Sequence, residues 1–299
     1  MKKLLSLSLC AALLLTLPAC AAKQDEPENP YRCTSIHYDF LDEDGNTSGT
    51  ETYEFIYTER DTDLHTTQIT YEDGIKVMEV SYEKDSYGNI IGITRTENGE
   101  TKTYNNKLTL DEQHRPTRIE SYCGNDLNSI TEYTYDEDGN ETCYTHTTIE
   151  NGEATEYYET RKTYDRDGNM TSQSILPSNI YLSWTHSDGK LIKREQANEN
   201  GVLQEYAEFE YDVQGREIKE TLYSPSGIYM SSSETTYDET GLVVTFTNYT
   251  GIDTHSTSRS ITTYDEYGNT LDRIFQIKIS GEWQTETHAT YTYEPIPTS

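Results

Sequence analysis

The sequence predicts an all-β fold, in which a long antiparallel meander of hairpin repeats forms a curved or spiral single β-sheet. Three observations predict it. A Tyr-Asp-x-x-Gly motif recurs with a period of about 26 residues, a looser glycine turn lies between its copies, and the segments between turns alternate apolar with polar residues. Those segments are about 8 to 10 residues long, which is typical of strands and too short for helical hairpins.

The clearest copies of the motif share both the tyrosine and the glycine. They begin at Tyr135, Tyr164, Tyr211, Tyr237 and Tyr264. Three further copies are incomplete and contain Asp85, Asp111 and Gly189. The looser turns between them include Asn98-Gly99 and Asn151-Gly152. A turn about every 13 residues therefore makes each repeat one pair of antiparallel strands.

The motif has the residues that a tight hairpin turn requires. An aspartate at the first position of a type I turn accepts hydrogen bonds from the backbone two residues on. Glycine at the fourth position adopts the left-handed conformation that closes a hairpin with a bulge. We therefore expect Asp136 and Asp165 to bind backbone N–H groups, and the motif glycines to have positive φ. These glycines are Gly139, Gly168, Gly215, Gly241 and Gly268.

Alternation along the strands predicts two unlike faces. In the segment 130–135, Tyr133 and Tyr135 alternate with Glu132 and Thr134. One face is therefore expected to be aromatic and aliphatic, and the other acidic. The positions three residues after the motif glycine are assigned to the apolar face, namely Ile91, Ile192, Ile218, Val244 and Leu271, although Thr142 and Thr171 break this pattern. The five motif tyrosines should form a ladder across the sheet.

The run Tyr-x-Tyr-Asp-x-x-Gly-Asn, with its period and its second glycine turn, resembles the YD repeats of the RHS family over roughly residues 80–293. In that family such strands wind into a spiral sheet, which in long members closes into a shell around a toxin domain. This chain is far shorter, so the resemblance implies the sheet alone. About 20 strands cannot stay flat, because large open sheets curl or split. We therefore expect a curved sheet that is open at its ends.

The first residues have the layout of a secretory signal, with Lys2 and Lys3 before an apolar stretch that is too short to span a bilayer. It ends in Leu-Pro-Ala-Cys20, which resembles the bacterial lipobox. In such proteins the cysteine receives lipid and the chain is cut just before it. The alternative is an ordinary signal peptide with a cysteine at its cleavage site. The predicted organisation is a signal peptide over 1–19, a flexible linker over 20–31 and a YD-like repeat domain over 32–299.

The composition excludes nucleic acid as a partner and leaves open how the cysteines are paired. The chain carries a formal charge of −30, so it is repelled by nucleic acid, and we expect no nucleic-acid partner. Loss of the signal removes two lysines and makes the charge more negative still. Cys33, Cys123 and Cys143 remain after processing. An odd number of cysteines leaves at least one thiol unpaired.

The sequence contains only weak patterns for a metal centre. The acidic turns at Asp42, Asp136 and Asp165 are similar to calcium loops, but their glycine comes fourth and strands flank them, so the turn explanation is preferred. Zinc ligands were sought among His114, Cys123, Cys143 and His146. Cys143 and His146 lie three apart, so a strand points them to opposite faces. We expect no cofactor and no metal.

The sequence predicts a non-enzymatic binding or display scaffold. It contains no Gly-x-Ser-x-Gly elbow, and its many carboxylates single out no acid–base pair. The predicted protein is a lipoprotein held in the cell membrane by a lipid on Cys20, facing the extracytoplasmic side, with a glycan or a protein as ligand. Two alternatives stay open: a partner or shell-like component for a toxin, and a glycan-active hydrolase, which would need a pocket with a pair of perturbed carboxylates.

Overall fold

The computed structural model describes residues 31–57, 65–250 and 255–296, which form twenty strands and the turns between them. The strands are β1 (Tyr31–Leu41), β2 (Thr47–Ile56), β3 (Thr67–Glu72), β4 (Ile75–Lys84), β5 (Ile90–Glu97), β6 (Glu100–Leu110), β7 (Pro116–Cys123), β8 (Asp126–Tyr135), β9 (Glu141–Glu150), β10 (Glu153–Tyr164), β11 (Met170–Leu176), β12 (Ile180–Ser187), β13 (Lys190–Ala197), β14 (Leu203–Tyr211), β15 (Glu217–Tyr223), β16 (Tyr229–Tyr237), β17 (Val243–Thr250), β18 (His255–Tyr264), β19 (Thr270–Ile279) and β20 (Glu282–Pro295). The predicted all-β meander is confirmed.

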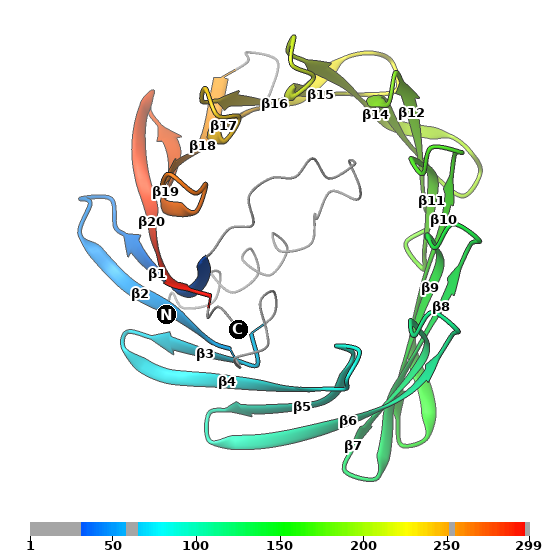
Figure 1. The fold of residues 1–299 in the computed structure, drawn as a ribbon. Helices are drawn as coiled ribbons and strands as arrows, with labels where there is room; N and C mark the ends of the chain where they lie inside the picture. Colours follow the sequence, from blue (N-terminus) through cyan, green and yellow to red (C-terminus); the bar gives the residue numbers. More distant parts are fainter. Residues whose placement is uncertain (1–30, 58–64, 251–254, 297–299) are drawn as a thin grey trace. The chain divides into compact units, whose positions relative to one another are not determined.

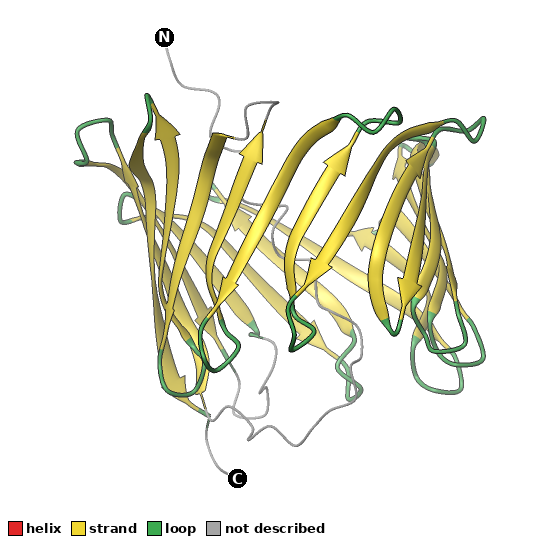
Figure 2. Ribbon diagram, turned by 90° about the horizontal axis from the view of Figure 1, so that it is seen from above, coloured by secondary structure: helices red, strands yellow, loops and turns green. Residues whose placement is uncertain are grey.

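The sheet closes into a barrel, so the predicted open sheet is wrong. Every strand pairs antiparallel with the next, and β1 also pairs antiparallel with β20, with Ile36 opposite Tyr291. Figure 1 views the barrel down its axis. The strands form a closed ring, in which β1 and β20 lie side by side. Figure 2 shows from the side that the strands lean relative to the barrel axis. Such a tilt is what closure of a sheet into a barrel requires.

Closure has a physical reason that local sequence patterns do not contain. An open meander leaves two edge strands with rows of unpaired N–H and C=O groups. Pairing β1 with β20 satisfies both rows at once. A salt bridge reinforces this seam, because Arg32 Nη2 lies 2.7 Å from Glu294 Oε1. The twist of the sheet, which we expected to produce an open spiral, therefore brings the two edge strands together and closes the sheet into a ring.

The barrel wall is one sheet thick and has little buried apolar core. Among the described residues, the buried hydrophobic side chains are those of Ala207 and Ala289, and no large side chain is fully buried. Several hydroxyl residues are also buried, including Thr70 and Thr160. Backbone pairing and contacts between adjacent hairpins therefore hold the fold together, as in repeat proteins whose units contact only their neighbours.

A β-bulge follows each Tyr-Asp turn. In the hairpin β8–β9, Thr134 lies opposite Cys143 and Tyr135 opposite Glu141, which leaves Thr142 as the extra residue. The same shift recurs at the third residue after the turn glycine in the other motif hairpins, at Ile91, Thr171, Ile218, Val244 and Leu271. A glycine-closed hairpin with a bulge was predicted, and the register confirms it.

The bulge also corrects the assignment of faces at this position. The Thr142 hydroxyl lies 2.9 Å from the Thr134 hydroxyl, and that of Thr171 lies 2.8 Å from that of Thr163. Both threonines therefore lie on the acidic side of the sheet, which is why they broke the apolar pattern. Leu271, which occupies the same bulge position in the hairpin β18–β19, is 40% exposed. The assignment of the third residue after glycine to the apolar face is wrong, because a bulge interrupts the alternation.

Candidate functional site

The Tyr-Asp turns line one rim of the barrel, which we call the YD rim. The hairpins β4–β5, β6–β7, β8–β9, β10–β11, β14–β15, β16–β17 and β18–β19 turn there. In the Asp165 turn, the N–H groups of Asp167 and Asn169 donate to Asp165 Oδ1, each at 2.9 Å. Asn140 N–H donates likewise to Asp136 Oδ1 at 2.8 Å. Asp136 and Asp165 therefore bind backbone N–H groups, as predicted.

The motif glycines have the predicted conformation. Their φ angles range from +81° at Gly268 to +94° at Gly241. In the incomplete copy, His114 takes the glycine position with a φ of +62°. Its N–H donates to the Asp111 carbonyl at 3.1 Å, so the turn survives without glycine.

The carboxylates of these turns are fixed by several donors. The pKa of Asp136 lies below its ordinary value, first because the Asn140 side chain donates to the carboxylate, at 3.0 Å. The pKa of Asp165 is lowered for the same reason through Asn169. Carboxylates that already accept such bonds are structural groups of the turn.

The motif tyrosines form the predicted ladder, and each one binds the preceding hairpin. The hydroxyl of Tyr135 donates to the carbonyl of Pro116 at 2.9 Å. Four further rungs repeat the contact at 2.5–2.9 Å: Tyr164 to Glu141, Tyr211 to Leu191, Tyr237 to Glu217 and Tyr264 to Val243. Each acceptor lies just after the turn of the neighbouring hairpin on the YD rim. The ladder is thus a row of identical clamps between hairpins.

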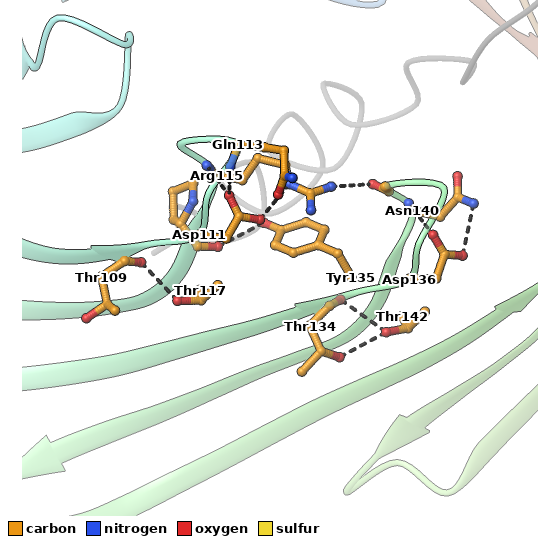
Figure 3. A network of polar contacts seen from close by, with 12 residues as sticks. Thr109, Asp111, Gln113, Arg115, Thr117, Thr134, Tyr135, Asp136, Asn140 and Thr142 are labelled. Atoms are coloured by element: carbon orange, nitrogen blue, oxygen red, sulfur yellow. Dashed lines mark hydrogen bonds and ion pairs between the residues drawn. The ribbon is translucent and has the colours of Figure 1, made fainter.

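Basic side chains, which were not predicted from the sequence, complete several of these clamps. The Arg115 guanidinium lies 4.1 Å from the centroid of the Tyr135 ring, and Arg216 lies 4.5 Å from that of Tyr237. Arg115 Nε donates to Asp111 Oδ2 of its own turn at 2.8 Å, beside the Tyr135 ring (Figure 3). Arg115 Nη1 donates to the Gly139 carbonyl of the next turn at 3.1 Å. The signal was present, because both arginines occupy the position directly after the turn glycine or its substitute, where other copies have asparagine.

These contacts make the ladder unsuited to be the main binding surface. Each of the five hydroxyls already donates to a backbone carbonyl. Burial raises the pKa of all five tyrosines, with Tyr135 and Tyr264 as examples. All five rings are partly buried. We therefore place the candidate site on the opposite face, which we call the carboxylate face and which carries Glu132, Glu159 and Thr134.

The carboxylate face carries two similar triads on β7 and β10. Each triad is an arginine, a glutamate and a tyrosine spaced two residues apart on one strand. On β7, Arg118 Nε donates to Glu120 Oε1 at 3.1 Å, and the Tyr122 hydroxyl donates to Glu120 Oε2 at 2.7 Å. On β10 the order is reversed, and both Arg161 and the Tyr157 hydroxyl donate to Glu159.

The electrostatics of the triads follow from these bonds. The pKa of Glu120 is lowered, first by the bond from Tyr122 and then by that from Arg118. The pKa of Glu159 is lowered in the same way by Tyr157 and Arg161. The Glu159 side chain is 10% exposed, whereas that of Arg161 is 68% exposed. Each carboxylate therefore stays ionised and holds its tyrosine and arginine in fixed orientations.

Two shallow pockets lie elsewhere on the described part of the chain. One, of about 370 Å³, is lined by Tyr181, Leu182, Ser183, Glu195, Ala197, Gly201 and Leu203. Its carboxylate, Glu195, is bound by Lys193 Nζ at 2.7 Å. The second, of about 570 Å³, lies at the seam beside the pair of Arg32 and Glu294. Glu195 and Glu294 thus already hold cationic partners, whereas Glu54, which also lines the second pocket, accepts a hydrogen bond from the Tyr71 hydroxyl at 3.0 Å.

One carboxylate has the environment expected of a catalytic acid. Burial raises the pKa of Glu217, and the charge of Glu220 raises it further. Glu220 itself accepts a hydrogen bond from Arg194 Nη2 at 2.7 Å. Neither glutamate lines either of the two pockets. Glu217 is therefore the residue to test for the hydrolase alternative.

The residues considered as metal ligands do not come together. Within the described ranges, no group of three or more His, Cys, Asp or Glu side chains is arranged to hold a metal ion. Cys143 pairs with Thr134 and Arg161 in the register, whereas His146 bonds the Thr131 hydroxyl at 3.0 Å. These partners place Cys143 and His146 on opposite faces, as predicted. Cys33, Cys123 and Cys143 are free thiols.

The predicted lipidation site, Cys20, lies outside the described residues, as do the signal peptide and most of the linker. A search of residues 31–57, 65–250 and 255–296 found no helix with the length and apolarity needed to cross a bilayer.

No family model matches the sequence, and no curated protein matches it. Several solved structures share distant features of the fold. A chain of the TcdB2-TccC3-Cdc42 complex aligns with 87% of this chain at 11% identity and a TM-score of 0.32, and a porin-like protein from Bacteroides uniformis aligns with 88% at 11% identity and a TM-score of 0.38. A Tc holotoxin pore from Photorhabdus luminescens also aligns, with a TM-score of 0.32.

The extent of these alignments differs. This chain spans 18% of the length of each of the two toxin chains and 98% of the porin-like protein. At these identities and TM-scores, the similarities assign neither a family nor an activity to the chain.

Proposed function

We propose that this protein is a lipid-anchored scaffold with YD-like repeats, held in the cell membrane through Cys20, that binds a glycan or protein ligand on the extracytoplasmic side without turning it over. The anchor and the kinship to YD repeats rest on the sequence alone. The scaffold role is supported by the five tyrosine clamps of the YD rim, each of which ties a hairpin to the one before it. A wall held in this way offers a stable surface for display.

One observation supports binding in particular: the carboxylate face carries partly exposed tyrosines that are oriented in advance by carboxylates. Tyr157 is 48% exposed, and its hydroxyl donates to Glu159. Tyr122, which is also partly exposed, repeats the arrangement with Glu120, at 2.7 Å. Rigid aromatic side chains that lose little entropy on contact are favoured in recognition surfaces. This face replaces the ladder as the proposed binding surface.

The anchor is tested by comparing the natural protein with Cys20→Ser during growth with labelled fatty acid. We expect lipid label and partition into detergent for the natural protein, because the thiol is the acceptor of the lipid. The variant should carry no label and should accumulate as precursor or be released. Equal fractionation of the two proteins, with label in neither, would contradict the anchor.

Turnover is tested separately with the purified full-length chain on panels of glycans and hydrolase substrates. We expect binding without bond cleavage. Glu217→Gln provides the matched comparison, because Glu217 is the carboxylate with a raised pKa. Cleavage that survives purification and disappears in Glu217→Gln would replace the scaffold with the hydrolase alternative.

A further inference from the structure

The two triads on the carboxylate face belong to one lattice that crosses four strands. The register places Arg118 opposite Glu132, Glu132 opposite Thr145, and Thr145 opposite Glu159. These four residues, on β7, β8, β9 and β10, therefore form one continuous row. Arg118 Nη1 lies 2.5 Å from Glu132 Oε1, which links the β7 triad to the next strand of the row.

A second row runs beside the first. It contains Glu120, Ile130, Thr147 and Tyr157, which are opposite one another in the same succession of strands. An aliphatic side chain and a threonine hydroxyl thus lie between the two triads. The two rows, together with Tyr122 and Arg161, which complete the two triads, define a surface that we call the β7–β10 patch.

The dimensions of this patch suit an extended ligand. The tyrosines of the two triads stand on β7 and β10, three inter-strand steps apart, which is about 14 Å. Between them lie the hydroxyls of Thr145 and Thr147 and the carboxylate of Glu132, whose side chain is 52% exposed. An aromatic ring at each end presents a flat apolar surface, while the groups between them donate and accept hydrogen bonds.

The charge of the patch indicates which kind of polymer it accepts. Three carboxylates and two guanidinium groups lie on it, and each triad carboxylate is already bound by an arginine. The patch is therefore almost balanced, in a chain whose formal charge is −30. That overall charge repels anionic polymers. A neutral ligand with flat apolar faces and many hydroxyls is not subject to this electrostatic repulsion.

We propose that the β7–β10 patch binds a neutral polysaccharide, whose pyranose rings lie against Tyr122 and Tyr157 while its hydroxyls bond Glu132 and the threonines between them. This inference rests on the proposed scaffold function and gives it a location and a ligand class. The arginines act as positioning residues, because they fix the carboxylates that orient the tyrosines. The polymer lies across the strands, since both rows run in that direction.

The test measures binding of the full-length protein in detergent to three soluble probes: a neutral β-glucan, a neutral mannan and the anionic polymer polygalacturonate. Affinity electrophoresis and titration calorimetry report binding. We expect at least one neutral probe to bind and polygalacturonate not to bind. Tyr157→Ala should weaken that binding about tenfold, which corresponds to about 1.4 kcal/mol, and Tyr157→Phe should stay closer to the natural protein because it keeps the ring.

Tyr71→Ala is the matched control, because it removes a tyrosine that also donates to a glutamate but lies on β3, outside the patch. Its binding should equal that of the natural protein, and melting curves should show that the variants stay folded. If the natural protein binds a neutral glycan but the Tyr157→Ala and Tyr71→Ala variants bind it with equal affinity, the β7–β10 patch is not the binding site. The proposed scaffold function is then unaffected. If no neutral probe binds, the glycan inference fails, whereas the lipid anchor and the absence of turnover are judged by the separate tests above.

Discussion

Two turns on opposite rims of the barrel use different chemistry to end their strands. On the YD rim, the Asp165 turn is a five-residue loop held by its own carboxylate, and Tyr164 reaches from beside it to the Glu141 carbonyl of the neighbouring hairpin. On the opposite rim, the turn at Asn151 and Gly152 joins β9 to β10 with two left-handed residues, whose φ angles are +53° and +82°. In that turn, the left-handed backbone conformation of these two residues is what reverses the chain.

The comparison teaches that turn formation and hairpin association are separate tasks in this fold. A pair of left-handed residues is sufficient to reverse the chain. Association of neighbouring hairpins in a wall with little buried apolar core requires further contacts, and the YD rim supplies them through tyrosine and arginine. The motif therefore stabilises two levels of structure at once, and substitutions on the two rims should separate them.

The largest difference between the rims is expected for the tyrosine clamp. Tyr164→Ala removes a partly buried ring and its hydrogen bond to the Glu141 carbonyl, which should lower the free energy of unfolding by about 2 kcal/mol. Tyr181→Ala is the control, since Tyr181 is 38% exposed near the opposite rim, and it should change stability by about 0.5 kcal/mol or less. Urea unfolding measures both. Equal losses for the two variants would show that the clamp does not stabilise the wall.

A smaller effect, equal on both rims, is expected for the turn glycines. Gly168 and Gly152 both have a φ of +82°, and a Cβ at either position would contact no atom within 4 Å. Gly168→Ala and Gly152→Ala should each destabilise the protein by about 1 kcal/mol, because the cost is that of the backbone conformation alone. Thermal or urea unfolding gives the values. A much larger loss at Gly168 would mean that the YD turn is constrained by more than its own conformation.

A gain of stability is expected where the YD rim lacks its glycine. His114→Gly should raise the free energy of unfolding by about 0.5 kcal/mol, because the left-handed conformation strains a residue with a side chain. The gain is limited by loss of the stacking between His114 and Tyr87, whose ring centroids lie 4.1 Å apart. Urea unfolding beside the Gly168→Ala series measures it. A loss of stability would show that the stacking outweighs the strain.

No effect is expected from calcium on either rim. The Asp136 and Asp165 carboxylates already accept backbone N–H groups and an asparagine side chain. Addition of millimolar calcium should therefore leave the melting temperature unchanged, as measured by calorimetry with and without chelator. A clear rise that chelator reverses would replace the turn explanation with metal loops.

The candidate site was only partly predictable. Alternation along β8 indicated a face with Glu132 and Thr134, and the structure confirms it. The triads were visible as the spacing of Arg118, Glu120 and Tyr122, yet so many carboxylates occur in the chain that this spacing did not stand out. Their assembly into rows depends on the register between strands, and each bulge shifts that register by one residue.

The sequence by itself determined the local structure of this protein, because turns and strands depend on residues close together in the chain. The aspartate at the start of each turn, the glycine at its fourth position and the alternation between turns were enough for the hairpins and, away from the bulges, for their two faces. Tertiary structure decided the partners of the ladder tyrosines, which lie about 20 residues away, and the closure of the ring. Pairing of β1 with β20 joins residues such as Cys33 and Tyr293 from opposite ends of the barrel domain. No local pattern encodes that contact, since it arises only when the twist of the whole sheet brings its two edges together.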